Sequence, residues 1–224
     1  MNKAEFIKEH GLSVIFRGID EEKIPAIVSA IYEGGGRIAE ITFDPSDPDT
    51  IRKTCSSLRA ARLAVPEDML IGVGTAISEE YVMAAHEAGA DFVYSPDTDP
   101  DVIRLTKKLG MVSIPGAFTP TECKAAYKYG ADIVKLFPTT IDSIGYIVNI
   151  TRPLSHIPFI CTGGANENTS EAFIEAGAVG VGTGVSILKP ELVKEGNYAE
   201  ISRLTRLHLE RIRAAKERRA AAGK

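Results

Sequence analysis

Three stretches of the sequence share one pattern: Glu87-Ala-Gly-Ala-Asp-Phe-Val93, Lys128-Tyr-Gly-Ala-Asp-Ile-Val134 and Glu175-Ala-Gly-Ala-Val-Gly-Val181. Glu33-Gly-Gly-Gly-Arg-Ile-Ala39 is a looser fourth copy. In each copy we expect a helix to end, a glycine to take the left-handed position after it, and an apolar strand to follow. The glycines at 89, 130 and 177 are 41 and 47 residues apart, so each interval has room for two strand–helix units. The pattern indicates a repeated β/α architecture.

Eight short, apolar strands are predicted, with helices between them. The strands cover residues 13–17, 37–43, 69–74, 91–95, 111–114, 132–137, 158–162 and 178–183. Helical spacing occurs over 78–89, 119–129 and 168–176, with Ser78, Thr119 and Asn168 as the expected N-caps. Alternating strands and helices favour a parallel sheet, and eight units favour a closed (β/α)₈ TIM barrel.

The alternative is an open, doubly wound sheet. Such a sheet usually carries a glycine-rich nucleotide loop, but Gly72-Val-Gly74 lacks the third glycine and Gly180-Val-Gly-Thr-Gly184 has the wrong spacing. We therefore expect one barrel domain over residues 1–224, with an extra helix at 1–10 and a C-terminal helix at 196–219. The basic end of the C-terminal helix is typical of a solvated helix that frays.

Composition excludes several classes of function. The 224 residues are 44% hydrophobic and 25% charged, as in ordinary soluble proteins, and the formal net charge is −4. An acidic chain is a poor candidate for binding nucleic acid. No apolar run approaches the roughly 18 residues of a membrane span, and the N-terminus has no signal-peptide pattern. Three scattered cysteines and four scattered histidines indicate neither a disulfide framework nor a metal site, so a cytoplasmic location is expected.

Polar side chains interrupt the apolar strands or close them. Lys135 lies within Ile133-Val-Lys-Leu-Phe137, and Glu40 lies within Ile38-Ala-Glu-Ile-Thr-Phe43. Arg17, Thr75 and Thr162 stand at strand ends. All five fall in the second half or at the end of their strands, and the carboxyl ends of the strands carry the active site of a TIM barrel. Because a buried ammonium group is costly, Lys135 and Glu40 are candidates for catalysis rather than for packing.

A buried lysine and a nearby carboxyl can perform Schiff-base chemistry. Burial lowers the pKa of a lysine, and the neutral amine attacks a ketone to form an imine, which is an electron sink. A carboxyl can then accept and return protons. Two glycine-rich turns, Thr162-Gly-Gly164 and Gly182-Thr-Gly184, follow the last two strands, where such barrels often bind phosphate through backbone N–H groups. The alternative is that these glycines only shape tight turns.

The sequence resembles the 2-keto-3-deoxy-6-phosphogluconate / 4-hydroxy-2-oxoglutarate aldolases from about residue 11 to 198. The resemblance rests on the order and spacing of six motifs: residues 33–42, Ile71-Gly-Val-Gly-Thr75, Val93-Tyr-Ser-Pro96, residues 114–122, Val134-Lys-Leu-Phe-Pro138 and Cys161-Thr-Gly-Gly164. It implies a class I, pyruvate-forming aldolase on a TIM barrel, without a cofactor or metal. It also implies a homotrimer that takes a small 2-keto acid and an aldehyde.

The resemblance also implies roles for residues of this chain. Lys135 would form the Schiff base and Glu40 would be the general acid and base. The substrate-binding residues would be Arg17, Thr75, Thr162 and Pro96. The phosphate-binding residues would be Gly163, Gly164, Gly182, Thr183 and Gly184.

Three positions depart from the family. Many members carry an arginine where this chain has Asp44, a glycine where it has Asp97, and a serine where it has Gly184. Arg17 would supply the positive charge that Asp44 does not. The acidic loop Asp44-Pro-Ser-Asp-Pro-Asp49 could alternatively hold a divalent metal, although it lacks the ligand spacing of a calcium loop.

The leading hypothesis is a lyase that cleaves a 2-keto-3-deoxy sugar acid, 6-phosphorylated as in 2-keto-3-deoxy-6-phosphogluconate, to pyruvate and an aldehyde such as glyceraldehyde 3-phosphate. Two alternatives remain open. One is a phosphate-binding isomerase or epimerase that uses Glu40 without an imine. The other is a catalytically silent sugar-phosphate sensor that kept the barrel.

Overall fold

Nine parallel strands form one sheet in the computed structural model, which describes residues 2–223. They are β1 (Leu12–Phe16), β2 (Ile38–Thr42), β3 (Leu70–Gly74), β4 (Phe92–Tyr94), β5 (Val112–Ile114), β6 (Gly116–Ala117), β7 (Val134–Leu136), β8 (Phe159–Thr162) and β9 (Gly180–Thr183). Met1 and Lys224, at the ends of the predicted helix 1–10 and of the predicted domain 1–224, lie outside the described residues. The single-domain assignment stays a prediction.

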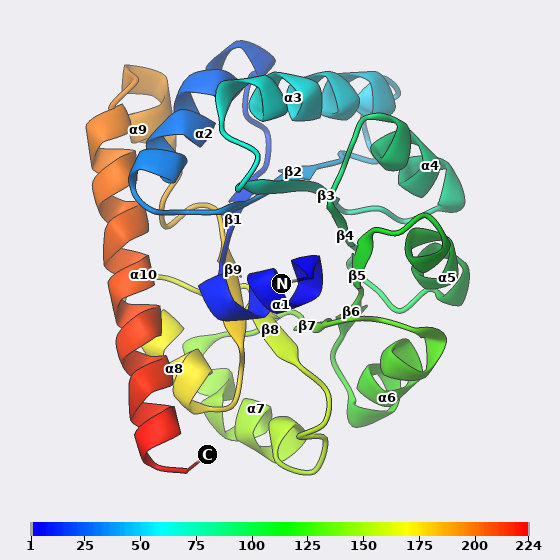
Figure 1. Cartoon of the computed structure of the whole chain (residues 1–224), viewed down its shortest axis with the longest axis vertical. Helices are drawn as coiled ribbons and strands as arrows, with labels where there is room; N and C mark the ends of the chain where they lie inside the picture. Colours follow the sequence, from blue (N-terminus) through cyan, green and yellow to red (C-terminus); the bar gives the residue numbers. More distant parts are fainter. Residues whose placement is uncertain (1, 224) are drawn as a thin grey trace.

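The sheet closes into a barrel, as predicted, and the open doubly wound alternative is wrong (Figure 1). β5 and β6 stand at the two ends of the strand order, but only Pro115 separates them. β5 pairs with β4 and β6 pairs with β7, so one path from Val112 to Ala117 joins the two ends. Proline has no backbone N–H to donate, which explains why the predicted fifth strand is divided into two at this position.

Helices alternate with the strands and form the outer layer (Figure 1). They are α2 (Ile24–Glu33), α3 (Thr50–Ala64), α4 (Glu79–Glu87), α5 (Pro100–Lys108), α6 (Pro120–Tyr129), α7 (Ile144–Thr151), α8 (Ser170–Glu175), α9 (Pro190–Glu195) and α10 (Tyr198–Ala221). Single 3₁₀ turns, Glu21–Lys23 and Ile141–Ser143, precede α2 and α7. The alternation of buried residues on the strands places one set of side chains against these helices and the other inside the barrel.

Two of the three expected N-caps are found. Ser78 accepts a hydrogen bond from the N–H of Tyr81, and Thr119 forms a capping box with Glu122. The expected cap Asn168 is wrong, because α8 begins at Ser170. The Asn166 side chain instead accepts from the backbone N–H groups of residues 168 and 169, in a turn that precedes the helix.

The N-terminal helix α1 (Lys3–His10) lies across one end of the barrel, at the centre of the ring in Figure 1. Its Ile7 is fully buried in a cluster of apolar side chains inside the barrel. The other buried residues of this cluster are Ile38, Leu70, Phe92, Tyr94, Val112, Ile114, Ile133 and Ile160. The amino ends of the strands are therefore plugged, and the carboxyl ends are left for a site.

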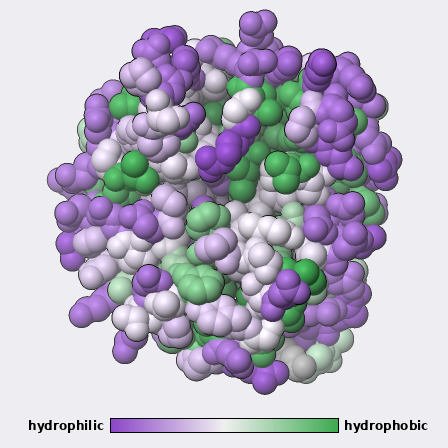
Figure 2. Space-filling model, turned by 180° about the vertical axis from the view of Figure 1, so that it is seen from behind, coloured by the Kyte–Doolittle hydropathy of each residue, from purple (hydrophilic) through white to green (hydrophobic). Residues whose placement is uncertain are grey.

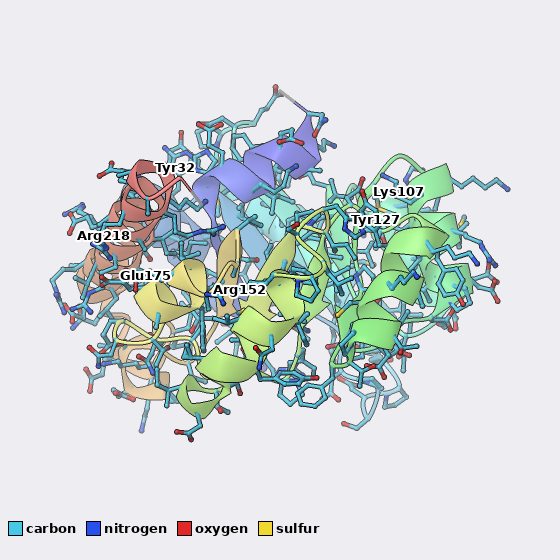
Figure 3. The ribbon with its side chains drawn as sticks, turned by 90° about the horizontal axis from the view of Figure 1, so that it is seen from below. Tyr32, Lys107, Tyr127, Arg152, Glu175 and Arg218 are labelled. Carbon is cyan, nitrogen blue, oxygen red and sulfur yellow. The ribbon has the colours of Figure 1, made fainter. Side chains whose placement is uncertain are left out.

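The C-terminal helix α10 is a packed part of the outer layer, and the fraying expected of its basic end stays a prediction. It lies against α2 and α8. Its buried residues include Ile201, Leu204, His208, Leu209, Ile212 and Ala215. Near the end of the helix, Arg218 forms ion pairs with Glu171 and, at 2.9 Å, with Glu175 of α8 (Figure 3).

Candidate active site

A cavity of about 400 Å³ opens at the carboxyl ends of the strands. Its size falls within the range of roughly 300–1,000 Å³ typical of small-molecule sites. Figure 2 views the face opposite α1, where hydrophobic and neutral residues lie over the centre and hydrophilic residues surround them. The structure brings every predicted site residue to this cavity: Arg17, Glu40, Thr75, Pro96, Lys135, Thr162, Gly163, Gly164, Gly182, Thr183 and Gly184.

Lys135 projects from β7 into the barrel interior and is only 6% exposed. Its Nζ atom lies 4.4 Å from the ring centre of Phe137 and 5.8 Å from that of Tyr94. Burial lowers the pKa of Lys135, the Glu40 carboxylate opposes this effect, and Arg17 adds to it. No carboxylate among residues 2–223 lies within 4.0 Å of Nζ. These surroundings favour a neutral amine, which is the nucleophilic form.

Glu40 projects inward from β2 and is 2% exposed. Burial raises the pKa of its carboxyl group, while Lys135 and Arg17 lower it. Thr42 Oγ1 is 3.5 Å from Oε1, and Oε2 has no hydrogen-bond partner within residues 2–223. A carboxyl whose pKa is raised by burial can both give and take a proton near neutral pH.

Arg17 and Thr75 meet at the rim of the cavity. Arg17 Nη2 donates to Thr75 Oγ1 at 3.3 Å. Thr75 is the one non-glycine residue of the described part with a positive φ, of 59°. Such strained backbone clusters at functional sites, because the surrounding structure must hold it in place. The pair combines a cation and a hydroxyl where a substrate carboxylate or hydroxyl group can reach them.

The two glycine turns lie next to each other along the cavity wall. The N–H groups of Gly163, Gly164, Gly184 and Val185 have no hydrogen-bond partner within residues 2–223. Free N–H groups on adjacent turns are a binding site for an anion. The glycines also allow close packing, since a Cβ at Gly163 or Gly164 would come within about 3.0 Å of the carbonyl oxygen of Thr139. Both interpretations of these glycines therefore have support.

The acidic loop after β2 is a hydrogen-bonded turn beside the cavity. Asp44 Oδ1 accepts from Ser46 N at 3.0 Å and from Ser46 Oγ at 2.6 Å, which lowers the pKa of Asp44. Asp47 pairs with Lys53 at 2.6 Å. Asp44 lines a neighbouring hollow that shares Arg17 with the main cavity. Within residues 2–223 no three His, Cys, Asp or Glu side chains gather as a metal site would require.

Several cavity residues were missed by the sequence analysis. Phe137 could have been found, because strand alternation places it on the same face as Lys135. Glu167 and Ser186 carry no such signal: Ser186 Oγ donates to Glu167 Oε2 at 3.2 Å and lies 2.7 Å from Nε2 of the buried His208. Burial lowers the pKa of His208 to about 4, so the imidazole is neutral near pH 7.

The fold and the cavity define a TIM-barrel enzyme with a buried lysine at the carboxyl end of its strands. A family model described as KDPG and KHG aldolase matches residues 4–204. These names abbreviate the 2-keto-3-deoxy-6-phosphogluconate and 2-keto-4-hydroxyglutarate substrates. The chain belongs to this aldolase family.

Individual relatives agree with this assignment. The chain is 33% identical over 183 residues to the probable 2-dehydro-3-deoxy-6-phosphogalactonate aldolase of Rhizobium meliloti (strain 1021), covering 81% of this chain and 84% of that protein. It is 30% identical over 179 residues to the 2-dehydro-3-deoxy-6-phosphogalactonate aldolase of Escherichia coli (strain K12), covering 80% and 84%. A solved structure described as "Native KDPGal structure" superposes with a TM-score of 0.81 at 27% identity, covering 92% of this chain and 96% of that one.

The predicted family, barrel fold and activity are thereby confirmed. The chain is a carbon–carbon lyase, a Schiff-base aldolase of 2-keto-3-deoxy sugar acids, and its substrates are small molecules. This finding favours the aldolase over the isomerase and sensor alternatives. No helix within residues 2–223 combines the length and the apolar character needed to cross a membrane.

Proposed function

We propose that Lys135 is the Schiff-base lysine and Glu40 the general acid and base for cleavage of a 6-phosphorylated 2-keto-3-deoxy sugar acid. The proposal rests on the buried Lys135 amine and the buried Glu40 carboxyl, which line one cavity. Burial lowers the pKa of Lys135 and raises the pKa of Glu40, and each group counteracts the effect of burial on the other. Burial alone favours the neutral forms of both groups, and these are the forms with which the reaction begins.

Imine formation is the first half of the proposed reaction. The Lys135 amine attacks C2 of the keto acid, and the carbinolamine loses its hydroxyl group as water after Glu40 protonates it. The resulting iminium ion carries the positive charge at nitrogen, and Glu40 is left as a carboxylate. A buried carboxylate without protein partners on Oε2 is a strong base, which suits the next step.

Cleavage is the second half. Glu40 removes the proton from the C4 hydroxyl, the C3–C4 bond breaks, and its electrons move to the iminium nitrogen to give an enamine. The aldehyde departs, C3 takes the proton back from Glu40, and water hydrolyses the imine. Hydrolysis of the iminium ion releases pyruvate, the neutral Lys135 amine and one proton, which Glu40 accepts, so that both groups return to the forms in which the reaction began.

The remaining cavity residues would bind the two ends of the substrate. We assign Arg17, Thr75, Thr162 and Pro96 to the keto-acid end, nearest the amine. The free N–H groups of Gly163, Gly164 and Gly184, with the Gly182-Thr183 segment, would hold the phosphate. Thr183 would act through its backbone, because its hydroxyl already donates to the carbonyl oxygen of Ala165 at 2.6 Å.

Between the two C4 epimers we favour the galactonate form. The two relatives that are 33% and 30% identical are both named as phosphogalactonate aldolases, whereas a Treponema pallidum relative named 2-dehydro-3-deoxy-phosphogluconate aldolase is 27% identical. The ratio of kcat/KM for the two epimers tests this choice directly.

The assembly and the compartment are also proposals. The family resemblance supports a homotrimer, which light scattering would distinguish from a monomer of 24.1 kDa. Three buried cysteines, all free thiols, are compatible with a reducing cytoplasm.

Borohydride reduction in the presence of pyruvate tests the proposed lysine. We expect one irreversible pyruvyl adduct per chain, located on Lys135 by peptide mass spectrometry, and loss of both adduct and cleavage in Lys135→Met. Lys107→Met, in which an exposed lysine is replaced, is the control and should keep both. An active enzyme that is modified on a different lysine, or not at all, contradicts the assignment.

A further inference from the structure

Glu167 is a carboxylate on the cavity wall that no step of the proposed reaction uses. It lies between β8 and α8, three residues beyond Gly164, and it lines the cavity together with Ser186. Ser186 follows the second glycine turn, two residues beyond Gly184. Both residues therefore border the turns to which we assign the phosphate. Because a carboxylate repels a phosphate group, its place beside these turns calls for an explanation.

The backbone around Glu167 is fixed by hydrogen bonds to the first glycine turn and to α10. Thr169 Oγ1 donates to the carbonyl oxygen of Gly164 at 2.7 Å and accepts from the N–H of Asn166 at 2.9 Å. Arg211 of α10 donates to the carbonyl oxygen of Glu167 itself. The segment is thus tied on both sides, and the fold sets the place from which the carboxylate reaches the cavity.

A chain of hydrogen bonds leads from the Glu167 carboxylate to a buried histidine. Ser186 Oγ donates to Glu167 Oε2 at 3.2 Å and lies 2.7 Å from Nε2 of His208. Since the hydroxyl has one proton and gives it to the carboxylate, its oxygen accepts the N–H of Nε2. His208 is fully buried and Ser186 is 7% exposed. The chain therefore begins in the protein interior and ends on a carboxylate at the cavity.

Ser170 completes the chain on the far side of the imidazole. Its Oγ lies 3.3 Å from Nδ1 of His208 and donates to the carbonyl oxygen of Asn166 at 2.7 Å. A neutral imidazole has one N–H, so with the proton on Nε2 the Nδ1 atom is an acceptor, and it shares the Ser170 proton with Asn166. Both ring nitrogens are thus engaged, which fixes the orientation of the ring and of the Ser186 hydroxyl.

The Glu167 carboxylate has acceptor capacity left for a ligand. Hydrogen bonds from its own backbone N–H and from Ser186 lower its pKa, so it is ionised near neutral pH. An ionised carboxylate only accepts hydrogen bonds, and it has about four lone-pair positions. Under the proposed roles, Lys135 takes the ketone at C2 and Glu40 takes the C4 hydroxyl. The remaining donor of the sugar acid is the C5 hydroxyl, which stands between C4 and the phosphate.

We propose that Glu167 is a specificity-determining residue whose carboxylate accepts a hydrogen bond from the C5 hydroxyl of the substrate. Ser186 and His208 are positioning residues that hold this carboxylate on the cavity wall. The inference rests on the proposed function, which assigns the two ends of the substrate. A site that pairs with a hydroxyl rejects an analogue without it, because its own polar group is then left unpaired. The inference also disfavours 4-hydroxy-2-oxoglutarate, since its C5 is a carboxylate that Glu167 repels.

The synthetic direction of the reaction tests the inference with two aldehydes. Glyceraldehyde 3-phosphate brings the hydroxyl that becomes the C5 hydroxyl of the product, and 3-oxopropyl phosphate lacks it. We compare the ratio of kcat/KM for these two aldehydes between enzymes, so that their intrinsic reactivities cancel. Because a hydrogen bond to a charged group is lost, the ratio in Glu167→Ala should be at least about tenfold smaller than in wild type.

Glu175→Ala is the matched control. It removes an exposed carboxylate of α8 that pairs with Arg218 on the outer layer at 2.9 Å (Figure 3), and it should leave the ratio unchanged. Ser186→Ala and His208→Leu should lower the ratio several-fold, in the same direction as Glu167→Ala. His208→Gln should keep the ratio, because the glutamine amide can present an N–H near the place of Nε2. A loss of stability alone lowers kcat/KM for both aldehydes and does not change their ratio.

Three outcomes overturn the inference. In Glu167→Ala, an unchanged ratio means that the carboxylate meets no substrate hydroxyl. An equal rise of kcat/KM for both aldehydes means that the carboxylate only repels the phosphate. An unchanged ratio in both Ser186→Ala and His208→Leu removes the positioning role.

Borohydride trapping separates this inference from the proposed function. Glu167→Ala should form the pyruvyl adduct on Lys135 to the same extent as wild type, because Glu167 takes no part in imine formation. If wild type forms no adduct on Lys135, the proposed function fails, whatever the ratio of the two aldehydes. If the adduct forms and Glu167→Ala keeps the wild-type ratio, the inference alone fails.

Discussion

Gly74→Ala is expected to lower kcat by about 100-fold without unfolding the barrel. Gly74 ends β3, and a Cβ added to it would lie 1.7 Å from Oε1 of Glu40, 2.5 Å from its Cδ and 2.9 Å from its Cγ. Ordinary contact begins at 3.4 Å, so the Glu40 carboxyl must move by about 1.7 Å. A displacement of about 1 Å costs a catalytic group on the order of 10²-fold in rate.

The fold should survive this substitution because the added methyl group meets only one flexible side chain. Gly74 does not have a positive φ, so alanine fits its backbone. Imine formation uses the Lys135 amine as nucleophile and Glu40 as the acid, so trapping of pyruvate by borohydride should become slower but should still modify Lys135. The thermal midpoint should stay within a few degrees of wild type, since no backbone atom is displaced.

The kcat of each variant is measured by coupling the release of pyruvate to lactate dehydrogenase. The thermal midpoint is measured by circular dichroism. Gly145→Ala is the control, since an added Cβ there meets nothing within 4 Å and kcat should not change. In a Glu40→Ala background, Gly74→Ala should cause no additional loss, because the clash is gone. A folded Gly74→Ala enzyme with kcat within threefold of wild type would refute the placement of Glu40 as the base.

Two further predictions concern the ends of the cavity. The kcat/KM for a phosphorylated substrate should exceed that for its unphosphorylated analogue by at least about tenfold, because each free N–H group of the two turns donates to an ionised oxygen. Equal values of kcat/KM would remove the phosphate assignment and favour a 4-hydroxy-2-oxoglutarate type of substrate. Arg17→Lys should raise KM several-fold with little change in kcat, since lysine keeps the charge but loses the planar pair of donors. Arg17→Ala should raise KM further. An unchanged KM in both variants would show that Arg17 binds no anion.

The location of the candidate site could be predicted from the sequence because its residues break a strong local rule. A lysine or glutamate in the middle of a buried strand is expensive, and this cost identified Lys135 and Glu40. The barrel was also predictable, because the helix–glycine–strand pattern repeats along the chain. In both cases the signal lies within a few neighbouring residues.

The features that were missed depend on contacts between distant segments. Tyr94 lies inside an apolar strand and is itself an ordinary strand residue, so only the structure shows that its ring is buried 5.8 Å from Nζ of Lys135. Ser186 and His208 meet across 22 residues of sequence, between a turn at the cavity and the buried face of α10. The failure at Asn168 has a local cause, since the Asn166 side chain accepts from the N–H groups of residues 168 and 169 and holds this segment in a turn, so that α8 begins only at Ser170.

The departure from the family at Asp44 has a structural explanation. Its carboxylate is held by Ser46 in the turn after β2, outside the lining of the main cavity, so it shapes the loop. Arg17 supplies the one guanidinium of the cavity lining within residues 2–223, and it reaches Thr75 from the end of β1. Because β1 and β2 are neighbours in register, a cation at the end of either strand can serve the same anion. Under the proposed roles, Arg17 of β1 would therefore supply the positive charge that Asp44 does not, beside the proposed catalytic pair Lys135 and Glu40.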